Sequence, residues 1–273
     1  MDSFLFILEN EVDEVYCTAS KFNRKELRNL IDFADNNLIR IKIIPDNKDI
    51  FFRSMTIEKY ESIPVLNLRK VPIDTEFGRI TKRIFDLIFS SLVIVLLLSW
   101  LIPIMYVIIN LESKGPIFFI QKRDGFKRRP FWCYKFRSMH ISDNADSKMA
   151  TKNDNRITKV GKFIRKTSID ELPQFINVFL GDMSVVGPRP HMELHTIDYE
   201  SSIDKYLVRH FVKPGITGLA QIKGYRGEIT KKSDIVNRTK LDIFYVEKWT
   251  LWLDIKIITL TLINAIRGEE KAY

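Results

Sequence analysis

A long apolar run in the first half of the chain limits how this protein can fold. From Leu87 to Leu111 the sequence reads LIFSSLVIVLLLSWLIPIMYVIINL, without a charged side chain. The run is about 25 residues long, which is sufficient for a helix that enters the hydrocarbon core of a bilayer. Helices in the core of water-soluble proteins are seldom apolar on every side over such a length. We therefore expect this segment to be inserted in a membrane.

The charges that flank the run bear on its topology. Basic residues lie on both sides of it, at Lys82, Arg83, Lys114, Lys122 and Arg123. A simple spanning helix favours basic residues on the cytoplasmic side only. The symmetric flanks favour a segment whose two ends both face the cytoplasm.

Pro103 lies inside the run and is expected to interrupt its helix. Proline lacks the backbone N–H and clashes with the preceding turn, so it leaves the carbonyl of Ser99 without its helical partner. We expect a nearby hydroxyl, such as that of Ser99, to bond this carbonyl. The sequence then predicts a re-entrant helix-break-helix that returns to the leaflet it entered, with a proline-kinked spanning helix as the alternative.

Composition restricts the binding partners. The chain has 43 Lys and Arg against 34 Asp and Glu, a formal charge of +9, which favours anionic partners such as lipid headgroups, phosphorylated small molecules or nucleic acid. Cys17 and Cys133 are the only cysteines, so neither a disulfide framework nor a zinc site is predicted. The start, Met1-Asp2-Ser3, is not typical of a secretion signal.

The apolar run divides the chain into three predicted parts, at residues 1–75, 82–112 and 113–273. In the first part we expect a small α/β segment with a helix at Arg24 to Ala34, a strand at Ile39 to Ile44 and a turn at Pro45-Asp46-Asn47. In the last part Leu251 to Ile266 is again apolar, which fits either a helix on the membrane surface or a core helix.

A predicted strand after the apolar run contains two basic side chains. In Phe131 to Met139 the alternation of an extended strand places Trp132, Tyr134 and Phe136 on one face, toward the core, and Lys135 and Arg137 on the other. The two cations then point the same way. A half-buried strand with a solvated basic face explains the same pattern.

Ser168-Ile169-Asp170-Glu171 has the form of a capping box. In that arrangement Ser168 caps a helix and the Glu171 side chain returns to the Ser168 amide. The other interpretation is chemical, because adjacent carboxylates at a helix start lie where phosphate and a divalent cation also bind. One carboxylate would then attack phosphorus while the other holds the metal.

Two segments rich in turn-forming residues follow. Gly181 to Pro190 surrounds Arg189 with glycine and proline, and Pro214 to Gly218 forms a second tight turn. Such loops bring the backbone close to a ligand, although turns of this kind are also common where nothing binds.

In this order, the segments resemble the bacterial sugar transferases known as monotopic polyprenyl-phosphate phosphoglycosyl transferases, over roughly residues 80 to 268. The resemblance rests on Lys82-Arg83 with Asp86, Gly115-Pro116 with Gln121, Arg123 and Gly125, Lys135 to Met139, Asp154 to Thr158, Ser168 to Gln174, Gly181 to Pro190, Pro214 to Gly218 with Gln221, and Leu241 to Tyr245. Family members commonly carry Ser-Pro at the membrane break, whereas this chain has Ile102-Pro103. Residues 1–75 resemble, more loosely, the end of a Rossmann-like domain in longer members.

The resemblance implies an α+β monotopic membrane protein: a re-entrant membrane hairpin and a mixed α/β catalytic domain at the cytoplasmic face of the bacterial inner membrane, preceded by a partial Rossmann-like segment. In the family an aspartate attacks the sugar-linked phosphate of a UDP-sugar and releases UMP, and polyprenyl phosphate then accepts the phosphosugar. Asp170 inherits the nucleophile role, and Asp170 and Glu171 would hold Mg²⁺. Candidates for phosphate and nucleotide contacts are Lys135, Arg137, Arg165, Arg189, Gln221 and Arg226, with Asp242 as a supporting carboxylate.

Two other classes of function explain less of the sequence. A catalytically idle, membrane-bound scaffold would use the same basic surface to bind nucleotide sugars or anionic lipid, but it gives no reason for the Asp170-Glu171 pair. Nucleic-acid binding accounts for the basic charge and leaves the apolar run without a role. We therefore expect no nucleic-acid partner.

Overall fold

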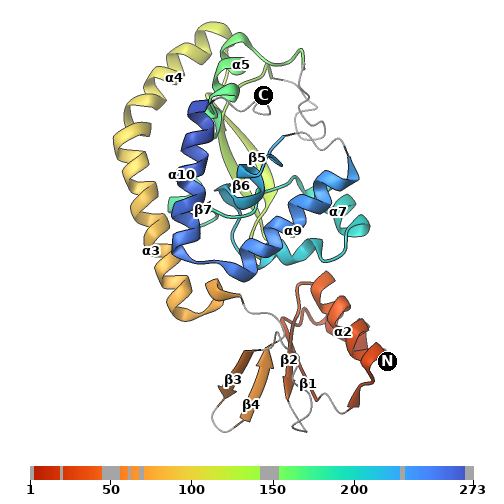
Figure 1. Cartoon of the computed structure of the whole chain (residues 1–273). Helices are drawn as coiled ribbons and strands as arrows, with labels where there is room; N and C mark the ends of the chain where they lie inside the picture. The colour runs from red at the N-terminus through yellow and green to blue at the C-terminus, as the bar shows by residue number, and fades with distance from the viewer. Residues whose placement is uncertain are drawn as a thin grey trace.

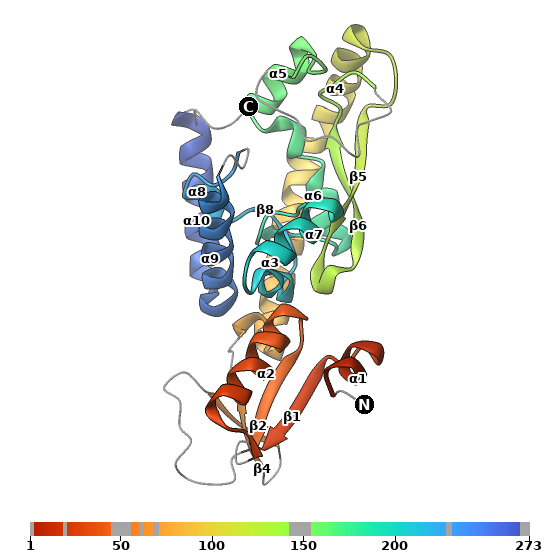
Figure 2. The same ribbon diagram turned by 90° about the vertical axis from the view of Figure 1, so that its right-hand side faces the viewer.

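The structure is a computed structural model in which residues 3–18, 21–44, 56–60, 63–67, 71–141, 154–227 and 231–267 are described. Within these residues the strands form one four-stranded sheet and two two-stranded sheets. The four-stranded sheet lies at one end of the molecule, and the remaining elements form a larger body above it (Figures 1 and 2). The molecule is thus a mixture of helices and strands with one long apolar helix along its side.

The N-terminal unit contains one parallel β-α-β crossover and one hairpin. Its elements are α1 (Ser3–Glu9), β1 (Glu14–Thr18), α2 (Arg24–Asn36), β2 (Arg40–Ile44), β3 (Thr56–Tyr60) and β4 (Ile63–Asn67). The strand order is β1-β2-β4-β3, with β1 parallel to β2 and the other pairs antiparallel. The helix and strand predicted here are confirmed, while the predicted turn at residues 45–47 lies outside the described residues.

This unit is bonded to the rest of the chain through α2. The Lys205 backbone N–H donates to Asn36 Oδ1 over 3.0 Å, and the Lys205 ammonium lies 3.5 Å from Asp32 and 3.3 Å from Asp35. Lys205 immediately precedes a 3₁₀ segment, Tyr206–Phe211. The N-terminal unit therefore contacts the residue that precedes this 3₁₀ segment.

The apolar run forms a continuous helix. It comprises α3 (Glu76–Val93), a π-helical turn (Ile94–Leu98) and α4 (Ser99–Glu112), together 37 residues and long enough to cross a membrane. Figure 1 shows α3 and α4 as one curved rod along the side of the molecule. Leu98, Leu101, Met105 and Ile109 form a buried stripe, whereas most other side chains of the rod are exposed or half-buried. The exposed apolar face is what lipid would cover.

The predicted break at Pro103 is wrong: the helix continues through this residue, and the irregular π-helical turn lies before it, at Ile94–Leu98. The Ser99 hydroxyl donates to the Val95 carbonyl over 2.7 Å, and the Trp100 indole N–H donates to the Leu96 carbonyl over 2.8 Å. The prediction that the Ser99 hydroxyl bonds the carbonyl freed by Pro103 is therefore wrong. Because a π turn displaces the regular hydrogen-bond pattern, these side chains bond the carbonyls of that turn instead.

The larger body consists of the helices and strands that follow the rod in the chain. These are β5 (Phe118–Asp124), β6 (Pro130–Phe136), α5 (Lys159–Lys166), α6 (Gln174–Leu180), β7 (Ser184–Val186), α7 (Glu193–Ser202), β8 (Gly215–Thr217), α8 (Leu219–Ile222), α9 (Lys232–Lys248) and α10 (Leu251–Arg267). β5 and β6 form an antiparallel hairpin, and β7 is parallel to β8. Figure 2 shows α8, α9 and α10 on one side of this body and the β5–β6 hairpin on the other.

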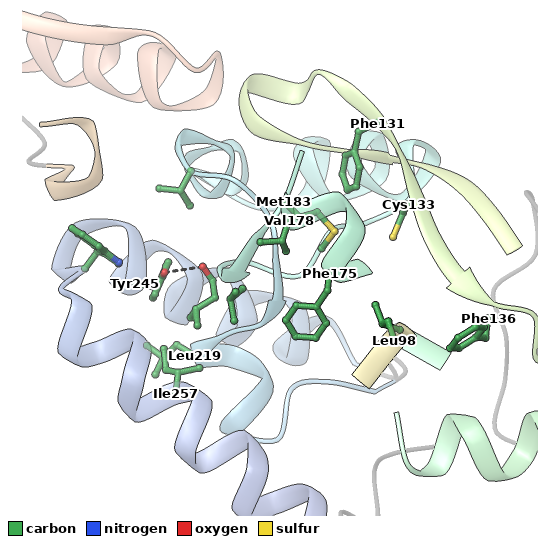
Figure 3. Close-up of a cluster of buried hydrophobic side chains, with 14 of the residues drawn as sticks. Leu98, Phe131, Cys133, Phe136, Phe175, Val178, Met183, Leu219, Tyr245 and Ile257 are labelled. Atoms are coloured by element: carbon green, nitrogen blue, oxygen red, sulfur yellow. Dashed lines mark hydrogen bonds between the residues drawn. The ribbon is translucent and has the colours of Figure 1, made fainter. Parts of the chain in front are cut away.

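The main core lies between these two sides. Figure 3 shows Phe175, Val178 and Met183 of the α6 region between Phe131 and Cys133 on the hairpin and the Tyr245 and Ile257 side. The helix α10 packs one face into this core and leaves another face exposed. Its Asp254 and Ile257 are fully buried, while Trp252 on the same helix is 79% exposed.

The alternation predicted for β6 is wrong in its first half. Phe131 and Cys133 are buried and Trp132 is 54% exposed, although Phe136 is buried as expected. The hairpin is covered on opposite faces at its two ends, because Phe136 meets Leu98 of the rod (Figure 3) while Phe131 and Cys133 face the α6 region. A single alternating pattern cannot describe a strand that changes its covered face.

A buried polar group fixes the start of the rod to the body. We call it the anchor cluster, and it consists of Lys82, Asp86, Ser184, Tyr245, Trp249 and Asp254. The Lys82 ammonium donates to Asp254 over 2.6 Å, and Asp86 accepts from the Ser184 hydroxyl and the Val185 N–H, both at 3.0 Å. Asp254 also accepts from the Tyr245 hydroxyl and the Trp249 indole.

The far end of the rod is bonded to the body as well. Glu112 accepts hydrogen bonds from the first two amides of α5, at Lys159 and Val160, over 2.7 and 2.9 Å. Arg137 donates to the Ser113 hydroxyl and the Lys114 carbonyl over 3.1 and 3.0 Å. Both ends of the apolar rod are thus held by polar contacts to the globular body.

Candidate active site

The paired carboxylates lie on a 3₁₀ turn, Ile169–Glu171, between α5 and α6. Both are buried, with Asp170 8% and Glu171 5% exposed. Ser168 precedes them in the left-handed region, with φ of 59°, and its side chain caps no helix. The predicted capping box is therefore wrong, because Ser168 has the wrong backbone conformation for a cap and the Glu171 side chain turns away to meet cations.

Three cationic side chains converge on Glu171. Lys135 Nζ and Arg189 Nη2 each lie 2.7 Å from Glu171 Oε1, and Arg226 Nη2 lies 3.1 Å from Oε2. Arg226 also donates to the Ser168 hydroxyl over 2.8 Å. We call Lys135, Asp170, Glu171, Arg189 and Arg226 the dyad cluster. The structure thus brings together five of the residues that the sequence proposed.

Lys135 is positioned by a contact between β6 and α6. The Asn177 side chain, which is fully buried, donates to the Trp132 carbonyl over 2.7 Å and accepts from the Tyr134 N–H over 3.0 Å. Asn177 lies on α6, which begins three residues after Glu171. One amide side chain therefore fixes the strand that carries Lys135 relative to the turn that carries the carboxylates.

Arg189 lies just after strand β7, where β7 is paired with β8. The Gly187 N–H donates to the Thr217 carbonyl, and the Gly215 N–H donates to the Pro188 carbonyl, both over 2.9 Å. A Cβ on Gly215 would lie 2.0 Å from the Gly187 nitrogen, and one on Gly218 would lie 2.2 Å from the Gly187 oxygen. These glycines allow backbones to approach each other closely.

Gln221 completes this side of the site. Its Oε1 accepts from Arg189 Nη1 over 3.1 Å, and its Nε2 donates to the Ile216 carbonyl over 3.2 Å. Gln221 lies on α8, immediately after the β8 turn. The paired strands β7 and β8 therefore fix the positions of both Arg189 and the Gln221 amide that bonds it.

The two carboxylates have opposite pKa shifts. Burial, followed by the neighbouring charge of Glu171, raises the pKa of Asp170 to about 6. Burial also opposes ionisation of Glu171, but Arg189, Lys135 and Arg226 together hold its pKa well below the usual value. Glu171 is therefore permanently ionised, while Asp170 changes its protonation state near neutral pH.

The remaining predicted residues take other positions. Arg165 lies close enough to Asp170 to favour its ionised form, and its buried Nε has no hydrogen-bond partner among the described residues. Arg137 bonds the end of the rod rather than the dyad cluster. Asp242 is buried behind the site, where it forms a 3.0 Å ion pair with Arg209 and does not contact the dyad cluster directly among the described residues.

The sequence did not point to the residues behind the dyad cluster. Arg209 and Arg238 contact His191, which follows Pro190 directly. No local pattern marks these residues, because they come from α9, a 3₁₀ segment and a loop that are distant in sequence. The only available signal was the position of His191 two residues after Arg189.

The fit of a magnesium ion depends on which carboxylate holds it. Both Glu171 oxygens already accept from cationic side chains, and no group of three or more His, Cys, Asp or Glu side chains suited to a metal occurs among the described residues. Asp170 has no side-chain hydrogen bond in the same part of the chain. Mg²⁺ is commonly bound by one or two carboxylates together with substrate phosphates. Asp170 fits that role, and Glu171 fits it only after losing a cationic partner.

The arrangement suits a reaction on a phosphate group. One carboxylate is available and ionises near neutral pH, and its neighbour holds two guanidinium groups and an ammonium group within a few ångströms. Three cations around one carboxylate leave an excess of positive charge that an anionic substrate would neutralise. Such a site can bind a diphosphate and present a carboxylate to phosphorus.

Known proteins match the chain over most of its length. The family model described as bacterial sugar transferase matches residues 77–268. A protein from Xanthomonas campestris named UDP-glucose:undecaprenyl-phosphate glucose-1-phosphate transferase is 40% identical over 98% of this chain and 56% of its own length. A protein of the same name from Caulobacter vibrioides is 41% identical over 70% of this chain and 72% of its own.

A further relative differs in the sugar that its name gives. A UDP-N-acetylgalactosamine-undecaprenyl-phosphate N-acetylgalactosaminephosphotransferase from Aeromonas hydrophila is 40% identical over 68% of this chain and 44% of its own length. The chain spans about half the length of the relatives that match it most completely. With the family model covering both the rod and the dyad cluster, the chain belongs to the bacterial sugar transferase family.

Proposed function

We propose that the protein transfers a sugar 1-phosphate from a UDP-sugar to undecaprenyl phosphate, or a similar polyprenyl phosphate, and so initiates a membrane-linked glycan. The observation that carries this proposal is Asp170, a buried carboxylate with a pKa of about 6 beside a carboxylate that holds three cations. The names of the relatives, which specify UDP-sugar donors and undecaprenyl phosphate, support the substrate classes. UDP-glucose is the first donor to test.

The proposed reaction has two displacements at one phosphorus atom. An Asp170 oxygen attacks the phosphorus attached to the sugar, the bond from this phosphorus to the bridging oxygen breaks, and UMP leaves with that oxygen. An oxygen of polyprenyl phosphate then attacks the same phosphorus and releases the Asp170 carboxylate. Lys135, Arg189 and Arg226 neutralise charge on the phosphate oxygens during both steps.

Magnesium is part of this proposal. Asp170, together with the donor diphosphate, would hold the ion, with Glu171 as a second ligand once a cation has moved. The ion supplies additional positive charge on the phosphate oxygens. The side chains of the chain itself orient the donor and keep Glu171 ionised.

We also propose that the rod is a re-entrant membrane segment that places the dyad cluster at the cytoplasmic face of the bacterial inner membrane. An acceptor with a long isoprenoid tail stays in the bilayer, so a site at the height of its phosphate shortens the search for it. The polar contacts at both ends of the rod, to Asp254 at one and α5 at the other, support a segment whose two ends lie on the same side.

Cysteine labelling tests this topology. In a variant without Cys17 and Cys133, single cysteines at Phe77 and Lys114, which are exposed at the two ends of the rod, are labelled in oriented membrane vesicles. Labelling of both from the cytoplasmic side is expected. Labelling of the two positions from opposite sides would show a spanning helix instead.

The catalytic proposal is tested with purified protein, Mg²⁺ and a panel of UDP-sugars. Without acceptor, intact-mass measurement of quenched samples should show a phosphosugar adduct that Asp170→Asn lacks, and labelled UMP should exchange into the UDP-sugar. An adduct that persists in Asp170→Asn would assign the nucleophile elsewhere. Binding of UDP-sugar without exchange or turnover would instead favour a catalytically idle scaffold.

A further inference from the structure

A second buried polar group lies directly behind the dyad cluster, centred on His191. Arg209 Nη1 lies 2.8 Å from His191 Nδ1, and Arg238 Nη1 lies 3.1 Å from His191 Nε2. The two guanidinium groups come from different elements, the 3₁₀ segment Tyr206–Phe211 and α9. Arg209 is 3% and Arg238 6% exposed.

Each of these arginines also donates to a backbone carbonyl. Arg209 Nη2 lies 2.5 Å from the carbonyl oxygen of Arg189, and Arg238 Nη2 lies 3.1 Å from that of Gly227. Arg189 holds Glu171 directly, and Gly227 follows Arg226, which also holds Glu171. The two buried guanidinium groups therefore bond the two backbone segments that carry the Glu171-binding arginines.

The buried charges of this group indicate that it does more than stabilise the fold. Arg209 has an ion pair with Asp242 at 3.0 Å, whereas Arg238 has no carboxylate within 4.0 Å in the described part of the chain. His191 is neutral, because burial and the neighbouring arginines hold its pKa well below the usual value. Burying a guanidinium without a carboxylate in direct contact is costly, and the charge of Asp242 offsets only part of the cost of burying Arg238.

We propose that Arg209 and Arg238 are positioning residues that hold Arg189 and Arg226 in place around Glu171. This inference rests on the proposed function, since the two Glu171-binding arginines are assigned there to the donor phosphates. Loss of the Arg238 bond to Gly227 frees the segment that carries Arg226, and Arg226 then spends less time near Glu171. Loss of the Arg209 bond acts in the same way on Arg189.

A double-mutant cycle between Arg238 and Arg226 tests the inference. Arg238→Met and Arg226→Met are each expected to lower kcat/KM for UMP exchange by about 10-fold or more, because contacts that position reacting groups carry effects of this size. The variant with both changes should match Arg226→Met within about 3-fold, since both act through one contact. Losses that multiply in the double variant would overturn the inference.

Two further variants make this result specific. Lys240→Met changes an exposed basic side chain on the same helix and should leave exchange unchanged. Arg238→Lys keeps one donor for the Gly227 carbonyl and should recover part of the activity that Arg238→Met loses. If Arg238→Met does not fold, Arg238→Lys takes its place in the cycle, with the same non-additive outcome expected.

Hydrogen exchange gives a measurement that does not depend on turnover. The Gly224 and Tyr225 amides donate to the carbonyls of Gln221 and Ala220 over 3.0 and 3.1 Å, immediately before Arg226. Their exchange should be about 10-fold faster in Arg238→Met and unchanged in Lys240→Met, since local opening exposes bonded amides. Unchanged exchange in Arg238→Met would overturn the positioning role, whereas absence of wild-type turnover would refute only the proposed function.

Discussion

The anchor cluster and the dyad cluster are both buried groups of charged side chains beside strand β7, but their carboxylates are treated differently. In the anchor cluster, Asp86 and Asp254 share one ammonium group and accept further bonds from a hydroxyl, an amide, a phenol and an indole. In the dyad cluster, Glu171 takes three cations and Asp170 has no hydrogen bond from a described side chain.

The comparison separates a structural use of buried charge from a chemical one. Neutral donors satisfy carboxylate oxygens in the anchor cluster, so no group there needs an external partner. The dyad cluster has more cations than its carboxylates can satisfy, and it has one carboxylate that remains available. This combination costs stability in the absence of a ligand, and the proposed phosphate substrate would offset that cost. Changes in the two clusters should therefore have opposite effects on activity and stability.

The largest effect is expected from Asp170→Asn. Loss of the proposed nucleophile should lower UMP exchange on the order of 10⁴-fold or more. The same change should raise the Tm by a few degrees near pH 7.5, because the raised pKa of Asp170 shows that its ionised form opposes folding. That contribution is absent below the unfolded pKa and complete above about 6, so the gain in Tm should shrink as the pH falls toward 4.

Thermal unfolding across pH checks this pattern. Asp182→Asn, at an exposed acid of the same body, is the matched control and should change neither property. A Tm gain for Asp170→Asn that stays constant down to pH 4 would contradict the assignment of an ionised, strained carboxylate.

The second largest effect is expected from Lys82→Met in the anchor cluster. It leaves Asp86 and Asp254 buried without their cation, which should destabilise the protein by about 3 kcal/mol and lower the Tm by roughly 10 °C. Exchange activity per folded molecule should stay within about 3-fold of the wild type. Lys162→Met, at an exposed position, serves as the control. Loss of activity in fully folded Lys82→Met would show that the two clusters are not independent.

The smallest effect is a change with pH rather than with sequence. Because the proposed attack on phosphorus requires an ionised Asp170, kcat/KM for exchange should decrease about 10-fold per pH unit below about 6. Ionisation of Glu171 should not add a second decrease to the pH profile in this range, since its pKa lies well below the usual value. A profile that is flat from pH 7 to pH 5 would remove the distinction between the two carboxylates.

The parts of the molecule that depend on short ordered motifs were predictable. The apolar rod, the carboxylate pair and the cations Lys135, Arg189 and Arg226 all lie in segments that the resemblance covers, and the structure brings them together. Local rules failed where contacts across the fold determine the geometry. Ser168 has the pattern of a cap but a left-handed backbone, and Trp132 is exposed because its strand changes its covered face.

The residues behind the site could not be predicted from spacing. Arg209 and Arg238 are separated from Arg189 by 20 and 49 positions in the sequence, and only the packing of α9 and the 3₁₀ segment brings them to His191. A basic residue in a basic chain gives no sign of the carbonyl it will bond. This information lies in the tertiary structure alone.

The three glycines beside the paired strands β7 and β8 affect how proteins of this family could come to use a different sugar donor. Because a side chain at Gly187, Gly215 or Gly218 would meet backbone atoms within 2.0 to 2.5 Å, the backbone next to Arg189, a proposed phosphate ligand, has almost no room for variation. Differences in sugar preference, such as those in the names of the relatives, are therefore expected to come from side chains elsewhere around the pocket. Redesign toward another nucleotide sugar should therefore keep these three glycines and vary other side chains around the dyad cluster.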